Sequence, residues 1–175
     1  MFVLGIDPGV SRCGYGCLAR SGGHDRAVAV GVITTPPADP LPRRLADLDR
    51  EIRSLLADLG PDAMAGDTRP VVAVERVFFQ VNARTAMSVG QASGLVLAAA
   101  TQAGWDVVQY TPNEVKQAVA GYGAATKEQV QRMVASLLGL PEPPRPADAA
   151  DALALALCHL AVAPLAARVA GATGP

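Results

Sequence analysis

The chain has 175 residues, enough for one domain with a substantial core but too few for two α/β lobes with a cleft between them. Half of the residues are hydrophobic and 4% are aromatic, so Ala, Val and Leu must build most of the core, and a disordered chain is excluded. The formal net charge of −1 excludes a strongly basic protein and confines any nucleic-acid surface to a local patch.

The cysteines and the apolar segments indicate a soluble, cytoplasmic protein. Cys13, Cys17 and Cys158 form neither a CxxC pair nor an even set, which argues against a disulfide framework or a structural zinc site. The acid at position 7 ends the N-terminal apolar run, which is therefore too short for a signal peptide. The most apolar tract, residues 153–170, contains a His, a Pro and an Arg, which favours a buried helix over a membrane span.

In chain order, the first part of the sequence predicts an antiparallel meander, a helix and a strand. Residues 2–7 are an apolar run closed by Asp-Pro-Gly, typical of a buried strand that ends in a turn. Residues 14–19 and 27–34 are two further strand candidates. After a proline-rich stretch, Leu and Ile recur at helical spacing over residues 41–59. Residues 71–74 form a β-branched strand that ends at an acid.

The second part predicts four helices and one strand. Residues 82–104 favour a long helix, and residues 105–110 a last strand. Thr-Pro opens a short helix over residues 111–120. Residues 126–138 are helical, with Thr at the cap position. A final Ala-rich helix begins near Pro146. We therefore expect a mixed α/β sandwich with a five-stranded sheet, a single domain over residues 1–170 and a frayed tail over residues 171–175.

Four acids carry the chemical hypothesis. Asp7 and Glu75 each close a predicted strand, with no basic partner nearby in this layout. Asp148 and Asp151 are three residues apart, which places both on one face of the last helix. If that face lies over the strand ends, the four carboxylates converge and require a cation. Ligand sets made only of oxygen favour Mg²⁺ or Mn²⁺, and two such ions support phosphoryl-transfer chemistry.

Each acid also has a simpler interpretation. Asp7 in Asp-Pro-Gly is compatible with a turn former, and Asp148 with a residue that favours a helix N-terminus. Asp151 is compatible with a solvated helix face. Glu75 is harder to explain in this way, because an acid that closes an apolar strand needs a partner or a ligand.

The two lysines of the chain are a second set of candidate functional residues. Of the 15 basic residues, only Lys116 and Lys127 are lysines. In a chain that otherwise uses Arg, a Lys indicates a need for a compact, mobile ammonium. Both are also compatible with solvated charges.

Taken together, these residues resemble the RuvC-type Holliday junction resolvases of the ribonuclease-H-like superfamily. The similarity extends from residue 5 to about residue 159 and is carried by segments 5–16 (GIDPGVSRCGYG), 74–78 (VERVF), 82–84 (NAR), 90–94 (GQASG), 115–117 (VKQ), 126–130 (TKEQV) and 147–153 (ADAADAL). The first motif alone is weak, but all of them in this order and spacing are specific.

The resemblance implies a ribonuclease-H-like five-stranded mixed sheet with helices on both faces. It implies a homodimer that binds a four-way DNA junction and makes paired, symmetric nicks, with Mg²⁺ as cofactor, Mn²⁺ as a substitute and two ions per site. It also implies that the protein acts together with branch-migration proteins of the RuvA and RuvB type.

The site residues implied by the resemblance follow the motifs. The metal-binding acids are Asp7, Glu75, Asp148 and Asp151, with Asp148 at a position that can hold His in some members. Lys116 and Lys127 match lysines near the scissile phosphate. Phe78 matches an aromatic that stacks on bases opened at the crossover, although core packing is an equally simple interpretation, and Arg76 and Arg84 are assigned to DNA binding. The helix over residues 82–104, with Gly90, Ala92, Ser93 and Gly94, is implied to help form the dimer.

Two alternatives come from other classes. An apolar strand that ends in Asp before a Gly-rich turn is also typical of actin-like ATPases and sugar kinases, but that architecture needs two such lobes and this chain has one. ATP turnover without DNA would favour it. The second alternative is a non-catalytic junction-binding module, which the presence of all four acids argues against.

Overall fold

One mixed sheet organises the protein. The computed structural model describes residues 1–66, 68–76 and 83–172, without the side chains of residues 83–85 and 165–172. The strands are β1 (Phe2–Asp7), β2 (Arg12–Ser21), β3 (His24–Thr34), β4 (Val71–Glu75) and β5 (Asp106–Tyr110), in the order β3-β2-β1-β4-β5. β1 pairs antiparallel with β2 and parallel with β4, and β4 pairs parallel with β5.

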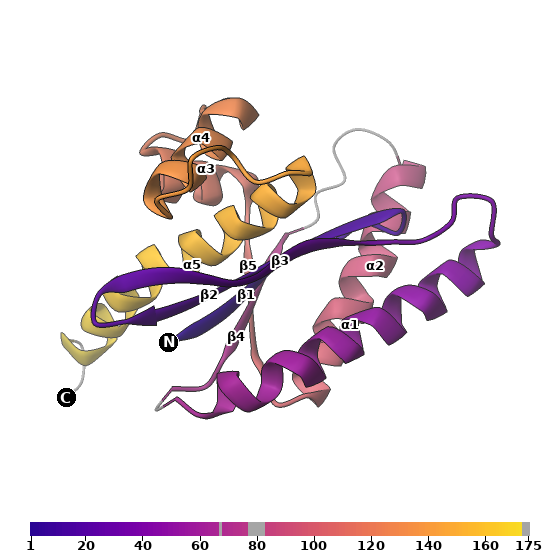
Figure 1. The fold of residues 1–175 in the computed structure, drawn as a ribbon, viewed down its shortest axis with the longest axis horizontal. Helices are drawn as coiled ribbons and strands as arrows, with labels where there is room; N and C mark the ends of the chain where they lie inside the picture. Colours follow the sequence, from indigo (N-terminus) through magenta and orange to yellow (C-terminus); the bar gives the residue numbers. More distant parts are fainter. Residues whose placement is uncertain (67, 77–82, 173–175) are drawn as a thin grey trace.

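Helices cover both faces of this sheet (Figure 1). α1 (Leu41–Met64) and α2 (Ala83–Gln102) lie on one face, whereas α3 (Pro112–Ala120), α4 (Lys127–Leu137) and α5 (Ala147–Ala172) lie on the other. Because successive strand residues point to opposite faces, Leu4 and Ile6 pack in the core with α1 and α2, while Val3 packs with α5. The run 2–7 is continuously apolar because both of its faces are buried. The predicted fold class is thus confirmed.

The largest differences from the predicted boundaries are in the β2–β3 hairpin and at the end of α1. The β2–β3 hairpin is longer than expected, because Gly22 (φ 57°) and Gly23 (φ 81°) form a two-residue turn with left-handed backbone, and the Gly-Gly pair was the available signal. α1 continues through Pro61 to Met64 instead of ending near residue 59. The burial of Ala63 against the core favours this extra turn despite the proline.

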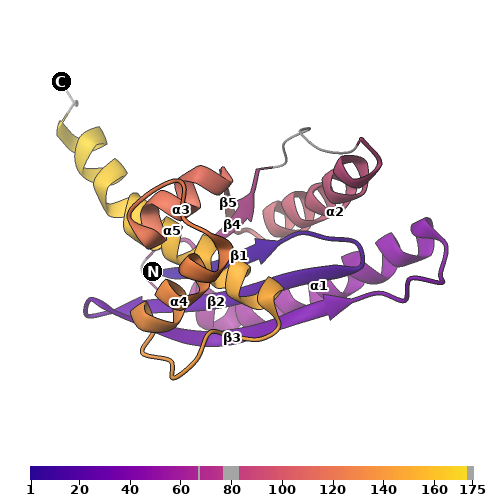
Figure 2. The same ribbon diagram turned by 90° about the horizontal axis from the view of Figure 1, so that it is seen from above.

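α5 is nearly apolar all round because it is a core helix. Residues 147–164 are long and apolar enough to cross a membrane by length and composition, but 61% of that window is buried inside the protein. The helix lies between the sheet and α3 and α4 (Figure 2). Its burial supports the predicted interpretation of the apolar tract as a buried helix.

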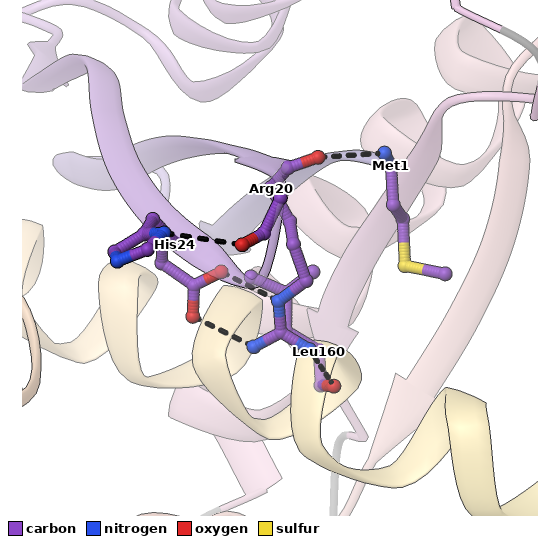
Figure 3. A network of polar contacts seen from close by, with 6 residues as sticks. Met1, Arg20, His24 and Leu160 are labelled. Atoms are coloured by element: carbon purple, nitrogen blue, oxygen red, sulfur yellow. Dashed lines mark hydrogen bonds and ion pairs between the residues drawn. The ribbon is translucent and has the colours of Figure 1, made fainter.

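Arg20 supplies a hydrogen bond that α5 lacks because of its internal proline. Pro164 lies inside the helix and has no N–H to donate to the carbonyl of Leu160. Arg20 Nη1 donates to that carbonyl oxygen instead, at 2.6 Å, while Nε and Nη2 donate to Asp25 at 2.6 and 2.7 Å. The Met1 ammonium in turn donates to the Arg20 carbonyl oxygen at 3.1 Å (Figure 3). The hairpin, the N-terminus and α5 are therefore joined at this point.

We expect Arg20→Met to destabilise the protein by about 2 kcal/mol, because it leaves a carbonyl and a half-buried carboxylate without their donor. Arg43→Met is the matched control, since Arg43 is 73% exposed and its ion pair with Asp39 is long, at 3.9 Å, and it should cost less than about 0.5 kcal/mol. Urea unfolding measures both. Equal effects in the two variants would contradict the role of Arg20.

Candidate active site

Asp7 and Glu75 lie at the same edge of the sheet. The parallel register pairs Ile6 with Val74, so the next residue of each strand is an acid. Ile6 and Val74 both pack toward α1 and α2, so side-chain alternation turns the two carboxylates to the other face, which α5 covers. Adjacent parallel strands thus bring together two acids that are 68 positions apart in the sequence.

Three glycines allow α5 to lie directly on the sheet. A Cβ at Gly5 would overlap the carbonyl oxygen of Ala152, and one at Gly14 would overlap the carbonyl oxygen of Asp148. A Cβ at Gly16 would lie 2.6 Å from Leu153 Cγ. The glycines of the first motif are therefore needed for close packing of a helix. This approach carries the first turns of α5, with both of its acids, over the ends of β1 and β4.

The pKa values of Asp7 and Glu75 reflect the convergence of the acids. Burial, together with the charges of Glu75, Asp151 and Asp148, raises the pKa of Asp7 from 3.8 to about 7, although Lys127 acts in the opposite direction. Burial and Asp151 likewise raise the pKa of Glu75, against Lys127 and Lys116. The two strand acids therefore occupy a site in which negative charge is poorly compensated.

Each acid of α5 contacts a base. Lys127 Nζ forms an ion pair with Asp151, and Arg12 Nη2 forms one with Asp148 at 2.8 Å. Burial opposes the charge on Lys127, but the hydrogen bond and charge of Asp151 outweigh it and raise the pKa of Lys127. The expectation that Asp7 and Glu75 have no basic partner nearby is therefore wrong, because Lys127 is within electrostatic range of both acids and Lys116 within range of Glu75.

The acids approach one another without forming a tight ligand cluster. Within residues 1–66, 68–76 and 83–172, no group of three or more His, Cys, Asp or Glu side chains is close enough to hold an ion. Arg12 and Lys127 instead neutralise the two aspartates of α5. The oxygen-only donors and the raised pKa of Asp7 nevertheless fit a hard divalent cation, which would relieve the repulsion.

A cavity of about 280 Å³ opens beside these acids. Its charged lining residues are Glu75, Asp151, Lys116 and Lys127, and the remaining lining is apolar, from Pro112, Val115, Val130, Ala154 and Leu155. The structure therefore places both lysines of the chain next to two of the predicted acids. A pocket with opposed charges on apolar walls suits an anionic group such as a phosphodiester.

Two residues of the site were missed by sequence reasoning. Arg12 contacts Asp148 through Nε at 2.9 Å as well as through Nη2, and Gln131 Nε2 donates to Asp151 at 3.5 Å. Arg12 lies in the glycine-rich motif, but no spacing rule connects it with a residue 136 positions away. For Gln131, the helical period of α4 was a signal, because Lys127 and Gln131 are four residues apart and share a face.

The structure describes only some of the predicted DNA-binding residues. Arg76 is exposed directly after β4, and its amide donates to the Tyr110 carbonyl oxygen at 2.8 Å. Phe78 lies outside the described residues. The backbone of Arg84 is in α2, but its side chain is also outside that description.

The raised pKa of Asp7 predicts a stability that falls with rising pH in the metal-free protein. Between pH 4 and 7 the folded chain keeps a proton that the unfolded chain has released, so stability decreases over this window, by up to about 4 kcal/mol. We expect Asp7→Asn to remove this loss. His159, whose pKa is lowered by burial, gives the opposite slope, so the difference between wild type and variant in urea unfolding with EDTA isolates Asp7. Parallel curves would contradict the prediction.

Comparisons with known proteins agree with this geometry. The family model for crossover junction endodeoxyribonuclease RuvC matches residues 3–159. RuvC of Moorella thermoacetica is 51% identical over 164 residues, which cover 94% of this chain and 93% of that protein. RuvC of Salinispora arenicola is 52% identical over 161 residues, covering 91% and 87%.

Solved structures give the same result. Thermus thermophilus RuvC is 40% identical with a TM-score of 0.82, covering 95% of this chain and 97% of that one. The structure described as T. thermophilus RuvC in complex with Holliday junction substrate is 41% identical, with a TM-score of 0.83 and coverage of 95% and 96%. From its sequence, its sheet order and its paired strand-end acids, this chain belongs to the crossover junction endodeoxyribonuclease RuvC family.

Proposed function

We propose that this chain, as a resolvase of four-way DNA junctions, uses Asp7, Glu75, Asp148 and Asp151 to bind the divalent metal on which cleavage depends. The observation that carries the assignment is the geometry: β1 and β4 pair in parallel and each ends in an acid, and Gly5 and Gly14 let α5, with Asp148 and Asp151, lie directly on the sheet. Burial and the charges of the other three acids accordingly raise the pKa of Asp7 to about 7. Such a site is unfavourable for folding and is typical of a site kept for function. Mg²⁺ is the proposed natural ion, with Mn²⁺ as a substitute and two ions per site.

The residues around this metal site have separate proposed roles. Asp7, Glu75, Asp148 and Asp151 would hold the ions, which when bound would supply an activated water and stabilisation of the leaving oxygen. Lys116 and Lys127 line the cavity beside the acids, where their ammonium groups can hold and orient a phosphate. Arg12 keeps Asp148 oriented over the strand ends through its ion pair.

The DNA itself is proposed to pass over the edge at which β1 and β4 end. Arg76 is exposed immediately after Glu75, and can contact a backbone phosphate. Phe78 and Arg84 are proposed, from the motif similarity alone, to act on bases and backbone at the crossover.

A labelled four-way junction tests the proposal. With Mg²⁺, the chain should make paired nicks at symmetric positions in two strands of the same junction, and chelation by EDTA should stop them. A linear duplex of the same sequence is the control and should be cut far less. Junction binding without nicks would indicate a non-catalytic binding module instead, and ATP turnover without DNA would indicate a nucleotide-binding protein.

A homodimer is the proposed assembly, since two copies related by a two-fold axis match two symmetric nicks. The small residues of α2 divide into two groups. Ala92 and Ser93 are buried against their own core, whereas a Cβ at Gly90 or Gly94 would meet no atom of the described residues within 4 Å. The face that carries Gly90 and Gly94 is therefore open to close approach by a second copy.

We expect Gly94→Gln to leave the monomer folded and to raise the dimer dissociation constant at least about tenfold, equivalent to 1.4 kcal/mol. Gly66→Gln, just after α1, is the matched control, because Gly66 is exposed and a Cβ there also meets no atom of the described residues. Sedimentation equilibrium measures association, and circular dichroism measures folding. Unchanged association of the Gly94 variant would place the dimer interface elsewhere.

Cytoplasmic location and action with branch-migration proteins of the RuvA and RuvB type are further proposals. Both follow from membership of the family and from a DNA junction as substrate.

A further inference from the structure

A second groove lies beside the proposed active site, between α4 and the segment that precedes α5. Its volume is about 750 Å³, within the range of ligand sites in proteins. Pro143, Pro144 and Pro146 contribute much of its apolar lining, and Gln131, Arg132 and Arg145 contribute its polar donors. Proline has no N–H, so a ligand in this groove must be held mainly by side chains.

The two arginines of the groove are available for a ligand. Both are exposed, and neither forms an ion pair or hydrogen bond with any side chain in the described part of the chain. Arginines elsewhere in the protein typically have carboxylate partners, as Arg20 has in Asp25 and Arg53 in Asp49.

The groove is positively charged overall. Glu128 is its one acidic lining residue in the described ranges, and it is near enough to Arg132 to interact electrostatically. Arg132 and Arg145 together outweigh this single charge. Ala147, the first residue of α5, also lines the groove, and the positive end of the helix adds to the field.

The groove is continuous with the proposed catalytic residues. Gln131 lines the groove and also donates to Asp151. Ala147 is adjacent to Asp148 in α5, and Arg132 and Lys127 are on the same helix, α4. A strand whose phosphate lies at the acids therefore has a path past Gln131 into the groove.

We propose that this groove binds the DNA backbone next to the cleavage site, with Arg132 and Arg145 each contacting a phosphate of the same strand. The proposal rests on the proposed function. DNA backbone is the occupant that fits, because planar guanidinium groups without a carboxylate partner of their own bind phosphate oxygens in bidentate fashion. The contacts are sequence-independent and fix the register of the strand over the acids.

Junction binding at several salt concentrations without divalent metal tests this assignment. Arg132→Ala and Arg145→Ala should each weaken binding about fivefold and reduce the slope of log affinity against log salt by about 1. Glu128→Gln should strengthen binding, since it removes the opposing charge. Arg26→Ala, an exposed arginine on the hairpin that has no ion pair within the described ranges, is the matched control and should have no effect.

A methylphosphonate scan of the junction locates the contact. Neutralising the phosphates that enter the groove should weaken wild-type binding but not binding by the Arg132/Arg145 double variant. If wild type binds and cuts the junction while the arginine variants keep its affinity and salt slope, the groove assignment is overturned and the proposed function stands. If wild type neither binds nor cuts junctions, the proposed function fails as well. The groove assignment would also be overturned if the arginine variants lost affinity but no methylphosphonate position affected wild type and the double variant differently.

Discussion

Replacing Asp7 by Asn is expected to reduce junction cleavage by about three orders of magnitude while junction binding changes less than about threefold. Asp7 is more deeply buried than Glu75, and its carboxylate is affected by the other three acids. The amide keeps the shape but removes the charge needed to hold a divalent ion, and losing one preorganised charged group costs about 10²- to 10³-fold or more in rate. Single-turnover cleavage and gel-shift binding measure the two effects separately.

The control for this prediction is Glu51→Gln, an isosteric change of an exposed acid on α1, which should cut at the wild-type rate. A thermal shift adds a measurement that does not depend on activity. Mn²⁺ should raise the melting temperature of wild type through binding to the folded state, and should raise that of Asp7→Asn much less. Rapid cleavage by the Asp7 variant would mean that the metal site has been wrongly assigned.

Replacing Gly5 by Ala is expected to destabilise the protein by about 3 kcal/mol, at the upper end for overpacking of a core. The added methyl group would overlap the carbonyl oxygen of Ala152, a backbone atom that no side-chain rotation can move. α5 must then move off the sheet and carry Asp148 and Asp151 with it. We therefore expect cleavage to fall about 10²-fold even at temperatures where the variant is folded.

Gly66→Ala distinguishes this steric effect from a general intolerance of glycine replacement. Gly66 is exposed after the end of α1, and a Cβ there would meet no atom of the described residues within 4 Å. The substitution should therefore change the stability by less than about 0.5 kcal/mol. Urea unfolding of both variants gives the comparison, and a Gly5 variant as stable as the Gly66 variant would show that α5 can adjust without cost.

The sequence determined the order and type of the elements well, because their signals are local. Alternation and apolar runs predicted all five strands, and Thr-Pro and Thr-Lys-Glu-Gln predicted the starts of α3 and α4, where Thr111 and Thr126 form capping boxes. It also selected the strand-end acids Asp7 and Glu75. Glu75 has no simple local explanation, whereas Asp7 in Asp-Pro-Gly could also be a turn former, so the sequence alone left its role open.

Only the tertiary structure decided which bases accompany these acids and how closely the helix approaches them. The ion pairs of Arg12 with Asp148 and of Lys127 with Asp151 join positions 136 and 24 residues apart, and no local period encodes such distances. The need for glycine at Gly5 and Gly14 is explained only by the backbone of α5 packed against them. Local preferences act within a few residues, whereas the charge balance of a site depends on every side chain that the packing of sheet and helices brings near it.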